Sequence, residues 1–231
     1  TSWGFINALK NDPVIWPYIG LLSYHLYGTN DPYRANIRDF GLARGIPTGQ
    51  TEYMSLTPAI LYDDLTLGGV SVWEVYGLSS QFTYSYNRIA KNSQYWAFRQ
   101  LLHYVRPGAV RIGAISDDTN LKVLAFTKGA ANTIVLINST GDRRAIINGL
   151  PAGDYSASHN NGGGPYQELG VRTVAAGGTL TIDVPSGAVL TIHSHPGVNQ
   201  PPVPTTWQAS SGYLIQPSSS ATLSATATDP E

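Results

Sequence analysis

The sequence predicts an α/β region followed by an all-β region, and two patterns support this division. Over residues 1–105, short apolar runs alternate with segments of helical periodicity, which is typical of parallel β/α units. Over residues 106–195, runs rich in Val, Ile and Thr are separated by turn-forming residues, which predicts antiparallel strands. A Pro-rich linker is then expected at 196–206, and the start of a further β-domain at 207–231.

Three strands and three helices are expected in the first region. The strands are predicted at 19–25, 46–53 and 70–76, and the helices at 33–43, 55–67 and 92–105. Because crossovers between parallel strands are right-handed, the strands should lie side by side with the helices outside. Three strands alone leave exposed sheet edges, which predicts further strands before Thr1 or in another chain.

The second region is expected to form a two-sheet sandwich. Its predicted strands are 110–112, 121–126, 133–138, 144–147, 155–158, 179–184 and 189–193. Beyond the linker, residues 213–229 alternate strand-like residues with Ser and Thr. This pattern resembles the opening strands of bacterial immunoglobulin-like repeats.

The composition excludes several classes of protein. Fourteen Lys and Arg residues balance 15 Asp and Glu residues, so the basic face that a nucleic-acid partner needs is not expected. No apolar run is long enough to predict a membrane span. The absence of Cys excludes disulfides, thiolate metal sites and a Cys nucleophile. A charged content of only 13% favours an extracellular or cell-surface protein.

Five short segments carry a recognisable pattern in their order and spacing. They are Ser23–Gly28 (SYHLYG), Thr51–Tyr53 (TEY), Val72–Glu74 (VWE), Tyr95–Phe98 (YWAF) and Val105–Ile112 (VRPGAVRI). In this order they resemble clan A glycoside hydrolases, and family 30 in particular, over residues 10–195. The resemblance implies that the first region is the C-terminal portion of a (β/α)8 TIM barrel, strands six to eight. A β-sandwich side domain would then follow, and after it the linker and the immunoglobulin-like start.

Glu52 is the candidate nucleophile of such an enzyme. Retaining glycosidases use two carboxyl groups about 5–5.5 Å apart, and barrel enzymes place catalytic groups at the carboxyl ends of strands. Glu52 ends a predicted strand, and the resemblance points to the same residue. The alternative is a surface Glu that caps the following helix. The family takes its acid/base Glu from strand four, usually in an Asn-Glu pair, and no such dipeptide occurs here. The acid/base residue is therefore expected outside this chain.

Four further residues are expected to bind substrate. His25 and Tyr27 end the preceding strand and, as alternate residues, would face the same side. A hydrogen bond from Tyr27 would hold Glu52 in its charged form. The resemblance implies that Trp73 is the floor of the subsite at the scissile bond, and Tyr53 is a candidate for the rim. Ordinary aromatic packing is the alternative for each ring.

The remaining charged residues are interpreted as structural. Glu74 points the opposite way from Trp73 along the strand and is expected to pair with a basic group such as Arg88; the alternative is a second carboxyl group of the site. Asp63 and Asp64 are expected at the surface. The residues expected on the solvated face of a helix are Arg34, Arg38 and Arg44. The lone pair His193 and His195 is weak evidence for zinc, so no metal and no cofactor is expected.

Two functions remain open from the sequence. The first is a fragment of a secreted retaining glycoside hydrolase that cleaves a β-linked glycan. Its partners would be a polysaccharide or oligosaccharide substrate and the remainder of the barrel, in cis or from another chain. The second is a non-catalytic structural or carbohydrate-binding module of an extracellular or cell-surface assembly. An adhesin without carbohydrate specificity has the least support.

Overall fold

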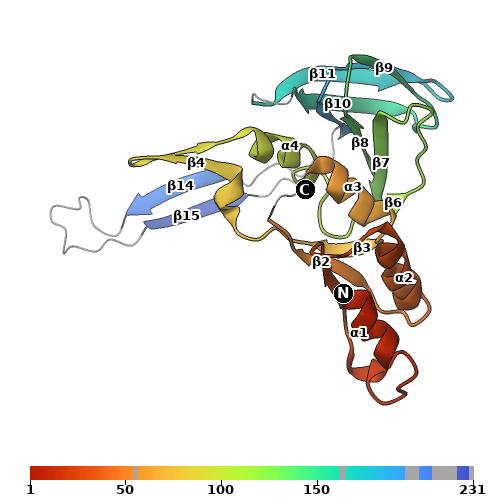
Figure 1. The fold of residues 1–231 in the computed structure, drawn as a ribbon. Helices are drawn as coiled ribbons and strands as arrows, with labels where there is room; N and C mark the ends of the chain where they lie inside the picture. The colour runs from red at the N-terminus through yellow and green to blue at the C-terminus, as the bar shows by residue number, and fades with distance from the viewer. Residues whose placement is uncertain (55–56, 162–164, 196–202, 210–222, 229–231) are drawn as a thin grey trace.

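The computed structural model describes residues 1–54, 57–161, 165–195, 203–209 and 223–228. Figure 1 shows a mixed α/β protein made mainly of sheets. A small parallel sheet with its helices comes first in the chain, and a larger antiparallel sheet follows. No helix in these ranges is long and apolar enough to cross a membrane.

The first sheet consists of three parallel strands in the order β1-β2-β3. The strands are β1 (Leu22–His25), β2 (Thr48–Glu52) and β3 (Val70–Trp73). The helices of this part are α1 (Ser2–Leu9), α2 (Asp31–Leu42) and α3 (Pro58–Thr66), with a 3-10 turn η1 (Trp16–Tyr18). The β1-α2-β2 and β2-α3-β3 crossovers follow the predicted alternation of strands and helices.

Local signals in the sequence explain where these helices begin. The side chain of Asn30 accepts a hydrogen bond from the backbone N–H of Tyr33, and Pro32 occupies the first turn of α2. Thr57 caps α3 in the same way, directly before Pro58. The apolar core between α1, α2 and the sheet consists of Ile6, Leu22, Tyr24, Ile37, Ile46 and Val70.

A buried polar network lies between α2, α3 and the sheet, contrary to expectation. Arg34 is 7% exposed and Asp64 is fully buried. The Nε of Arg34 donates to Oδ1 of Asp64 at 2.8 Å, and the hydroxyl of Tyr24 donates to the same oxygen at 2.8 Å. The predicted positions of Arg34 on a solvated face and Asp64 at the surface are therefore wrong. A buried charge needs a partner of opposite charge, and Arg34 and Asp64 are such partners for each other.

The second part is built on a six-stranded sheet in the order β11-β10-β13-β8-β7-β6, with antiparallel pairing throughout. The strands are β6 (Val110–Ile112), β7 (Leu121–Lys128), β8 (Ala131–Asn138), β10 (Gly153–Asn160), β11 (Gln167–Val174) and β13 (Val189–His195). A two-stranded sheet pairs β9 (Arg143–Ile147) with β12 (Leu180–Val184).

Each face of the six-stranded sheet is covered by other elements. One face packs against β9 and β12 through a core that includes Leu136, Ile182 and Leu190. The other face packs against α3 and α4 (Ser93–Leu102) through a core that includes Leu61, Phe98 and Val135. This second core joins the two parts of the chain.

Several elements were not predicted. They are α1, η1, η2 (Leu78–Gln81), β11 and the hairpin of β4 (Phe82–Ser85) and β5 (Arg88–Lys91). The hairpin projects away from both sheets (Figure 1). Strand β14 (Val203–Ala209) begins inside the predicted linker and pairs with β15 (Leu223–Thr228). Residues 196–202 of that linker lie outside the described residues, as do 55–56 of the predicted second helix.

Candidate active site

The candidate site lies where the three parallel strands end. Because β1, β2 and β3 run in the same direction, their carboxyl ends meet at one edge of the sheet. His25 and Glu52 are the last residues of β1 and β2, and they are partners in the strand register. The structure therefore brings together two of the residues predicted for the site.

A bulge in β2 decides which face of the sheet Glu52 occupies. Tyr24 pairs with Gln50 and His25 pairs with Glu52, so Thr51 is an extra residue without a partner in β1. Tyr24 and Gln50 are buried on the helix side of the sheet. His25 points to the opposite side, and the bulge directs Glu52 to that same open side. Without the extra residue, Glu52 would share the buried side of Gln50.

The carboxylate of Glu52 is close to an imidazole and open to solvent. Nδ1 of His25 lies 3.8 Å from Oε1 of Glu52, with side-chain exposures of 47% and 35%. This separation is too long for a hydrogen bond but within the range of an ion pair when His25 is protonated. The carboxylate of Glu52 is therefore accessible to a ligand, with the imidazole of His25 beside it.

Two tyrosines complete the group around Glu52. The ring of Tyr27 lies 6.3 Å from that of His25 and 5.2 Å from that of Tyr53, measured between centroids. Partial burial, followed by the charge of Glu52, raises the pKa of Tyr27. Contrary to expectation, the hydrogen bonds of the described residues include none between Tyr27 and Glu52. The charge of Glu52 nevertheless acts on the hydroxyl of Tyr27. Tyr27 remains half-exposed.

Trp73 does not join this group. Its indole N–H donates to Oδ2 of Asp64 at 3.0 Å, and its ring lies 5.2 Å from that of Phe98. Both partners belong to helices, so the side chain of Trp73 is on the helix side of the sheet. The role predicted for Trp73, as a floor for the sugar ring, does not fit this position.

The neighbouring Glu74 occupies the open side instead. Side chains alternate along a strand, so Glu74 points away from the helices that hold Trp73. Its backbone N–H donates to the carbonyl of Gln50, which continues the pairing of β3 with β2. The expected ion pair with Arg88 is not among those of the described residues. Glu74 is therefore a second exposed carboxylate at this edge, in the orientation that the alternation along its strand predicts.

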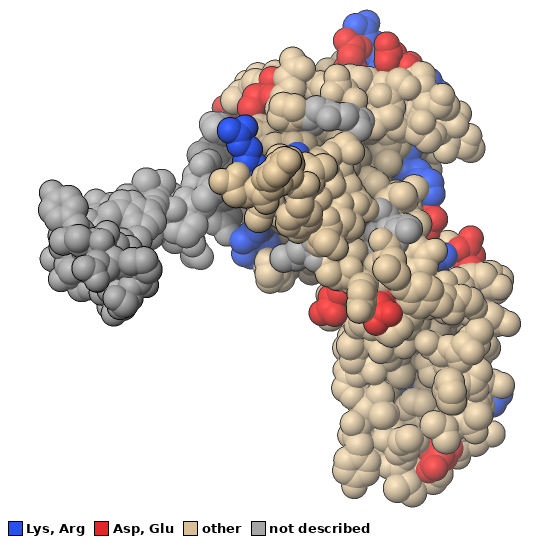
Figure 2. Space-filling model, turned by 60° about the vertical axis from the view of Figure 1, so that its left-hand side comes forward, with Lys and Arg blue, Asp and Glu red and all other residues tan. Residues whose placement is uncertain are grey.

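Two further features of the described residues concern possible metal ligands and surface charge. Within the described ranges, no group of three or more His, Asp and Glu side chains is placed to hold a metal ion. Figure 2 shows charged side chains only in small, separate groups on the face in view, in agreement with the low charged content.

Comparison with known proteins gives matches in structure only. No family model and no curated protein matches the sequence. A family 30 subfamily 8 xylanase from Clostridium acetobutylicum matches with a TM-score of 0.70 and 20% identity, over 82% of this chain and 52% of the enzyme. A family 30 endoxylanase from Clostridium papyrosolvens matches with a TM-score of 0.66 and 18% identity, over 80% and 51%.

The fold resembles that of clan A glycoside hydrolases, with family 30 well represented. A family 44 xyloglucanase from Paenibacillus polymyxa also matches, with a TM-score of 0.52 and 15% identity, over 72% of this chain and 36% of the enzyme. The resemblance inferred from the sequence is thus confirmed for the fold. The chain spans about half the length of the family 30 structures that it matches.

Proposed function

We propose that this chain is part of a retaining glycoside hydrolase that acts on a β-linked plant or microbial glycan. Glu52 is the nucleophile in this proposal. Its carboxylate oxygen attacks the anomeric carbon while the bond to the leaving-group oxygen breaks, which forms a glycosyl ester. The leaving oxygen takes a proton from a second carboxyl group. Water then cleaves the ester, and the second carboxyl group accepts the proton of that water.

The position of Glu52 is the observation that carries the proposal. It ends the middle strand of a parallel sheet, at the edge where barrel enzymes place their catalytic groups. The bulge at Thr51 directs its side chain to the open face, beside His25. A surface Glu that merely caps the next helix would need neither feature, and Thr57 already caps that helix.

The acid/base carboxyl group is assigned to a part of the barrel outside this chain. In a complete barrel, further strands would continue the sheet beyond β1 and β3, and β6–β13 would form the sandwich side domain. The residues after it would form a linker and an immunoglobulin-like start. The glycan would bind across the open face, with His25, Tyr27 and Tyr53 as contacts. The family 30 and family 44 matches, described as xylanases and a xyloglucanase, suggest xylan or xyloglucan. Such a substrate fits an extracellular or cell-surface protein.

The test compares variants in an active polypeptide that contains this chain. Glu52→Gln should lower kcat on xylan or xyloglucan by at least about a thousandfold, because the covalent step is lost. Glu168→Gln, an exposed carboxylate on β11, is the matched control and should keep full turnover. Glu52→Ala with added azide should give a glycosyl azide of inverted configuration. Unchanged turnover in Glu52→Gln would end the assignment.

A non-catalytic carbohydrate-binding module is the second candidate. The paired rings of Tyr27 and Tyr53, 5.2 Å apart and partly exposed, favour it because aromatic faces bind sugar rings without any chemistry. This function predicts that Tyr27→Ala and Tyr53→Ala abolish glycan binding, while Glu52→Gln leaves it intact and no polypeptide with this chain hydrolyses the glycan. Turnover that depends on Glu52 would reject it.

A further inference from the structure

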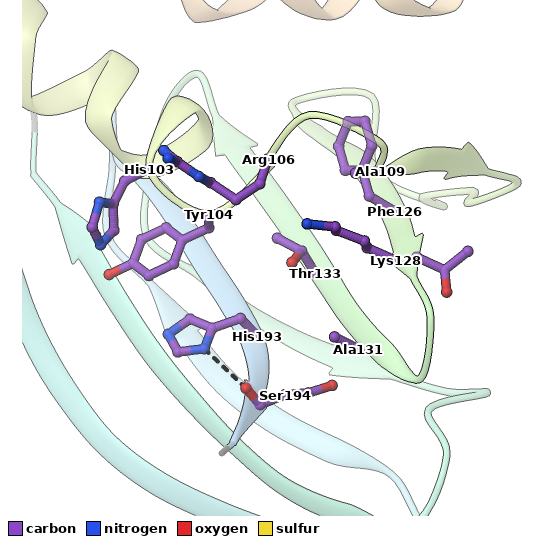
Figure 3. A pocket seen from close by; sticks show the side chains of 11 residues that line it. His103, Tyr104, Arg106, Ala109, Phe126, Lys128, Ala131, Thr133, His193 and Ser194 are labelled. Atoms are coloured by element: carbon purple, nitrogen blue, oxygen red, sulfur yellow. Dashed lines mark hydrogen bonds between the residues drawn. The ribbon is translucent and has the colours of Figure 1, made fainter. Parts of the chain in front are cut away.

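A small cavity lies between the loop that follows α4 and the six-stranded sheet (Figure 3). Its volume is about 80 Å³. The loop contributes His103, Tyr104 and Arg106, and the strands β7, β8 and β13 contribute most of the rest. None of its residues belongs to β1, β2 or β3, so the cavity is separate from the residues around Glu52.

Positive charge dominates the cavity. Arg106 and Lys128 line it from opposite elements, the loop and the end of β7, and no Asp or Glu is among its lining residues. Across the described part of the chain, the ion pairs of Lys and Arg side chains involve neither residue. By contrast, Lys122 on β7 and Arg143 on β9 each hold a carboxylate. Because no carboxylate of the lining offsets the charges of Arg106 and Lys128, both would attract an anion bound in the cavity.

A hydroxyl at the wall of the cavity adds a third donor. Thr133 on β8 is 9% exposed as a whole residue, and Figure 3 shows its hydroxyl oxygen on the side of the cavity. The hydrogen bonds within the described ranges include none that uses this hydroxyl, and its oxygen is not among the buried atoms that lack a partner. The hydroxyl is therefore accessible from the cavity and can donate to a ligand there.

Two stacked rings form the opposite wall. The ring of Tyr104 stacks on that of His193 with centroids 4.5 Å apart and an interplanar angle of 19°. The hydroxyl of Tyr104 lies 2.9 Å from that of Ser158, and Nδ1 of His193 lies 3.2 Å from the carbonyl of Ser194. These contacts hold both rings at the wall of the cavity.

The neighbouring His103 responds to the charge of Arg106 as well as to burial. Burial lowers the pKa of its imidazole, and the charges of Arg99, Arg106 and His193 lower it further. An anion bound beside Arg106 would oppose the part of this lowering that is due to charge.

We infer that this cavity binds a small oxyanion, held by Arg106, Lys128 and the hydroxyl of Thr133. A cavity of about 80 Å³ is far below the roughly 300 Å³ at which pockets for whole small molecules begin, so it admits one group and not a complete sugar ring. A carboxylate, sulfate or phosphate has the charge and acceptor oxygens that Arg and Lys recognise. The group can be a free inorganic anion or the carboxylate of an acidic sugar in a glycan. The inference does not depend on the role of Glu52.

Calorimetric titration of the chain, with a parallel NMR titration of His103, tests the inference. The probes are inorganic phosphate, sulfate and glucuronic acid, with glucose as the neutral control, all at constant ionic strength. Saturable binding of at least one anion, with a higher pKa of His103 in its presence, is the expected result. Binding of glucuronic acid identifies an acidic sugar as the source, and binding of phosphate or sulfate alone identifies a free anion.

Two variants separate this site from general surface charge. Arg106→Gln and Lys128→Gln should each weaken anion binding at least about tenfold, because each removes a charge-assisted hydrogen bond. Both side chains are exposed, so folding should be preserved, which circular dichroism checks. Arg88→Gln on the β4–β5 hairpin removes an equal charge elsewhere and should leave binding unchanged. No saturable binding, or equal binding by all three variants and the parent, would overturn the inference.

Discussion

Arg34 and Asp64 form a buried ion pair that ties α2 to α3, with 2.8 Å between Nε and Oδ1. The hydroxyl of Tyr24 and the indole of Trp73 also donate to Asp64, so one carboxylate is linked to both helices and to two strands of the parallel sheet. Burial raises the pKa of Asp64, and its three hydrogen-bond donors oppose that shift. The same network holds Trp73 on the helix side, which leaves Glu74 on the open face.

Asp64→Asn should lower the free energy of unfolding by roughly 3–5 kcal/mol, because Arg34 would lose its main counter-charge inside the protein. Urea denaturation followed by fluorescence measures the change. Asp39→Asn is the matched control, since its ion pair with Arg38 is largely exposed and should contribute less than about 1 kcal/mol. Equal effects of the two substitutions would contradict the central place of Asp64 in this network.

Gly41→Ala should destabilise the chain by about 1–3 kcal/mol. A Cβ at Gly41 would lie 2.6 Å from the carbonyl oxygen of Ile46, and a backbone atom cannot move aside as a side chain can. The absence of a side chain there lets the end of α2 approach the start of β2. Gly20→Ala is the control, because nothing lies within 4 Å of its Cβ position. The midpoint of thermal unfolding should fall in Gly41→Ala and stay unchanged in Gly20→Ala. An unchanged midpoint in Gly41→Ala would show that the close contact between the end of α2 and the start of β2 is not needed for stability.

Stability should fall as the pH drops below about 6.5, the ordinary pKa of His. Burial lowers the pKa of both His103 and His159, so the unfolded chain binds more protons than the folded chain in this window. The free energy of unfolding therefore rises with pH up to about 6.5 and is lost as both rings are forced to protonate below it. Denaturation at pH 7.5 and pH 5.0 measures the difference.

His103→Gln and His159→Gln should each reduce that difference, since a Gln does not titrate. Backbone and Arg partners lower the pKa values of Asp118 and Asp183. Their protonation therefore changes the free energy of unfolding only below about pH 4, outside the range in which the two His residues act. A pH dependence that is identical in the parent and in both variants would contradict the assignment to these two residues.

The sequence alone predicts much of the fold because its signals are local. Apolar runs predict the strand end at His25, and they place the ends of the next two strands one and three residues beyond Glu52 and Trp73. Helix α3 is predicted from residue 55, with Pro58 in its first turn, and it begins at Pro58. What the sequence misses depends on distant partners. Arg34 looks solvated on its own helix, because Asp64 is 30 residues away. The tip of the β4–β5 hairpin carries Tyr86 at φ 51°, a conformation usually taken by Gly or Asn, so the turn signal was weak.

The candidate site was predictable in part for the same reason. Strand ends bring His25 and Glu52 to one edge, and this follows from parallel pairing alone. The bulge at Thr51 is a property of the pairing between two strands and leaves no mark in the local pattern. The side of the sheet taken by Trp73 likewise depends on Asp64 and Phe98, which the residues around Trp73 do not reveal.

Covalent trapping tests the role of Glu52 most directly. A 2-deoxy-2-fluoro glycoside with a dinitrophenolate leaving group needs no acid catalyst, so labelling reports the nucleophile alone. The experiment uses an active polypeptide that contains this chain, xylosyl and glucosyl reagents, and peptide mapping by mass spectrometry. One glycosyl group is expected on the peptide that contains Glu52, and none in Glu52→Gln. A label on Glu74, or on any other residue, would contradict the role of Glu52 as nucleophile.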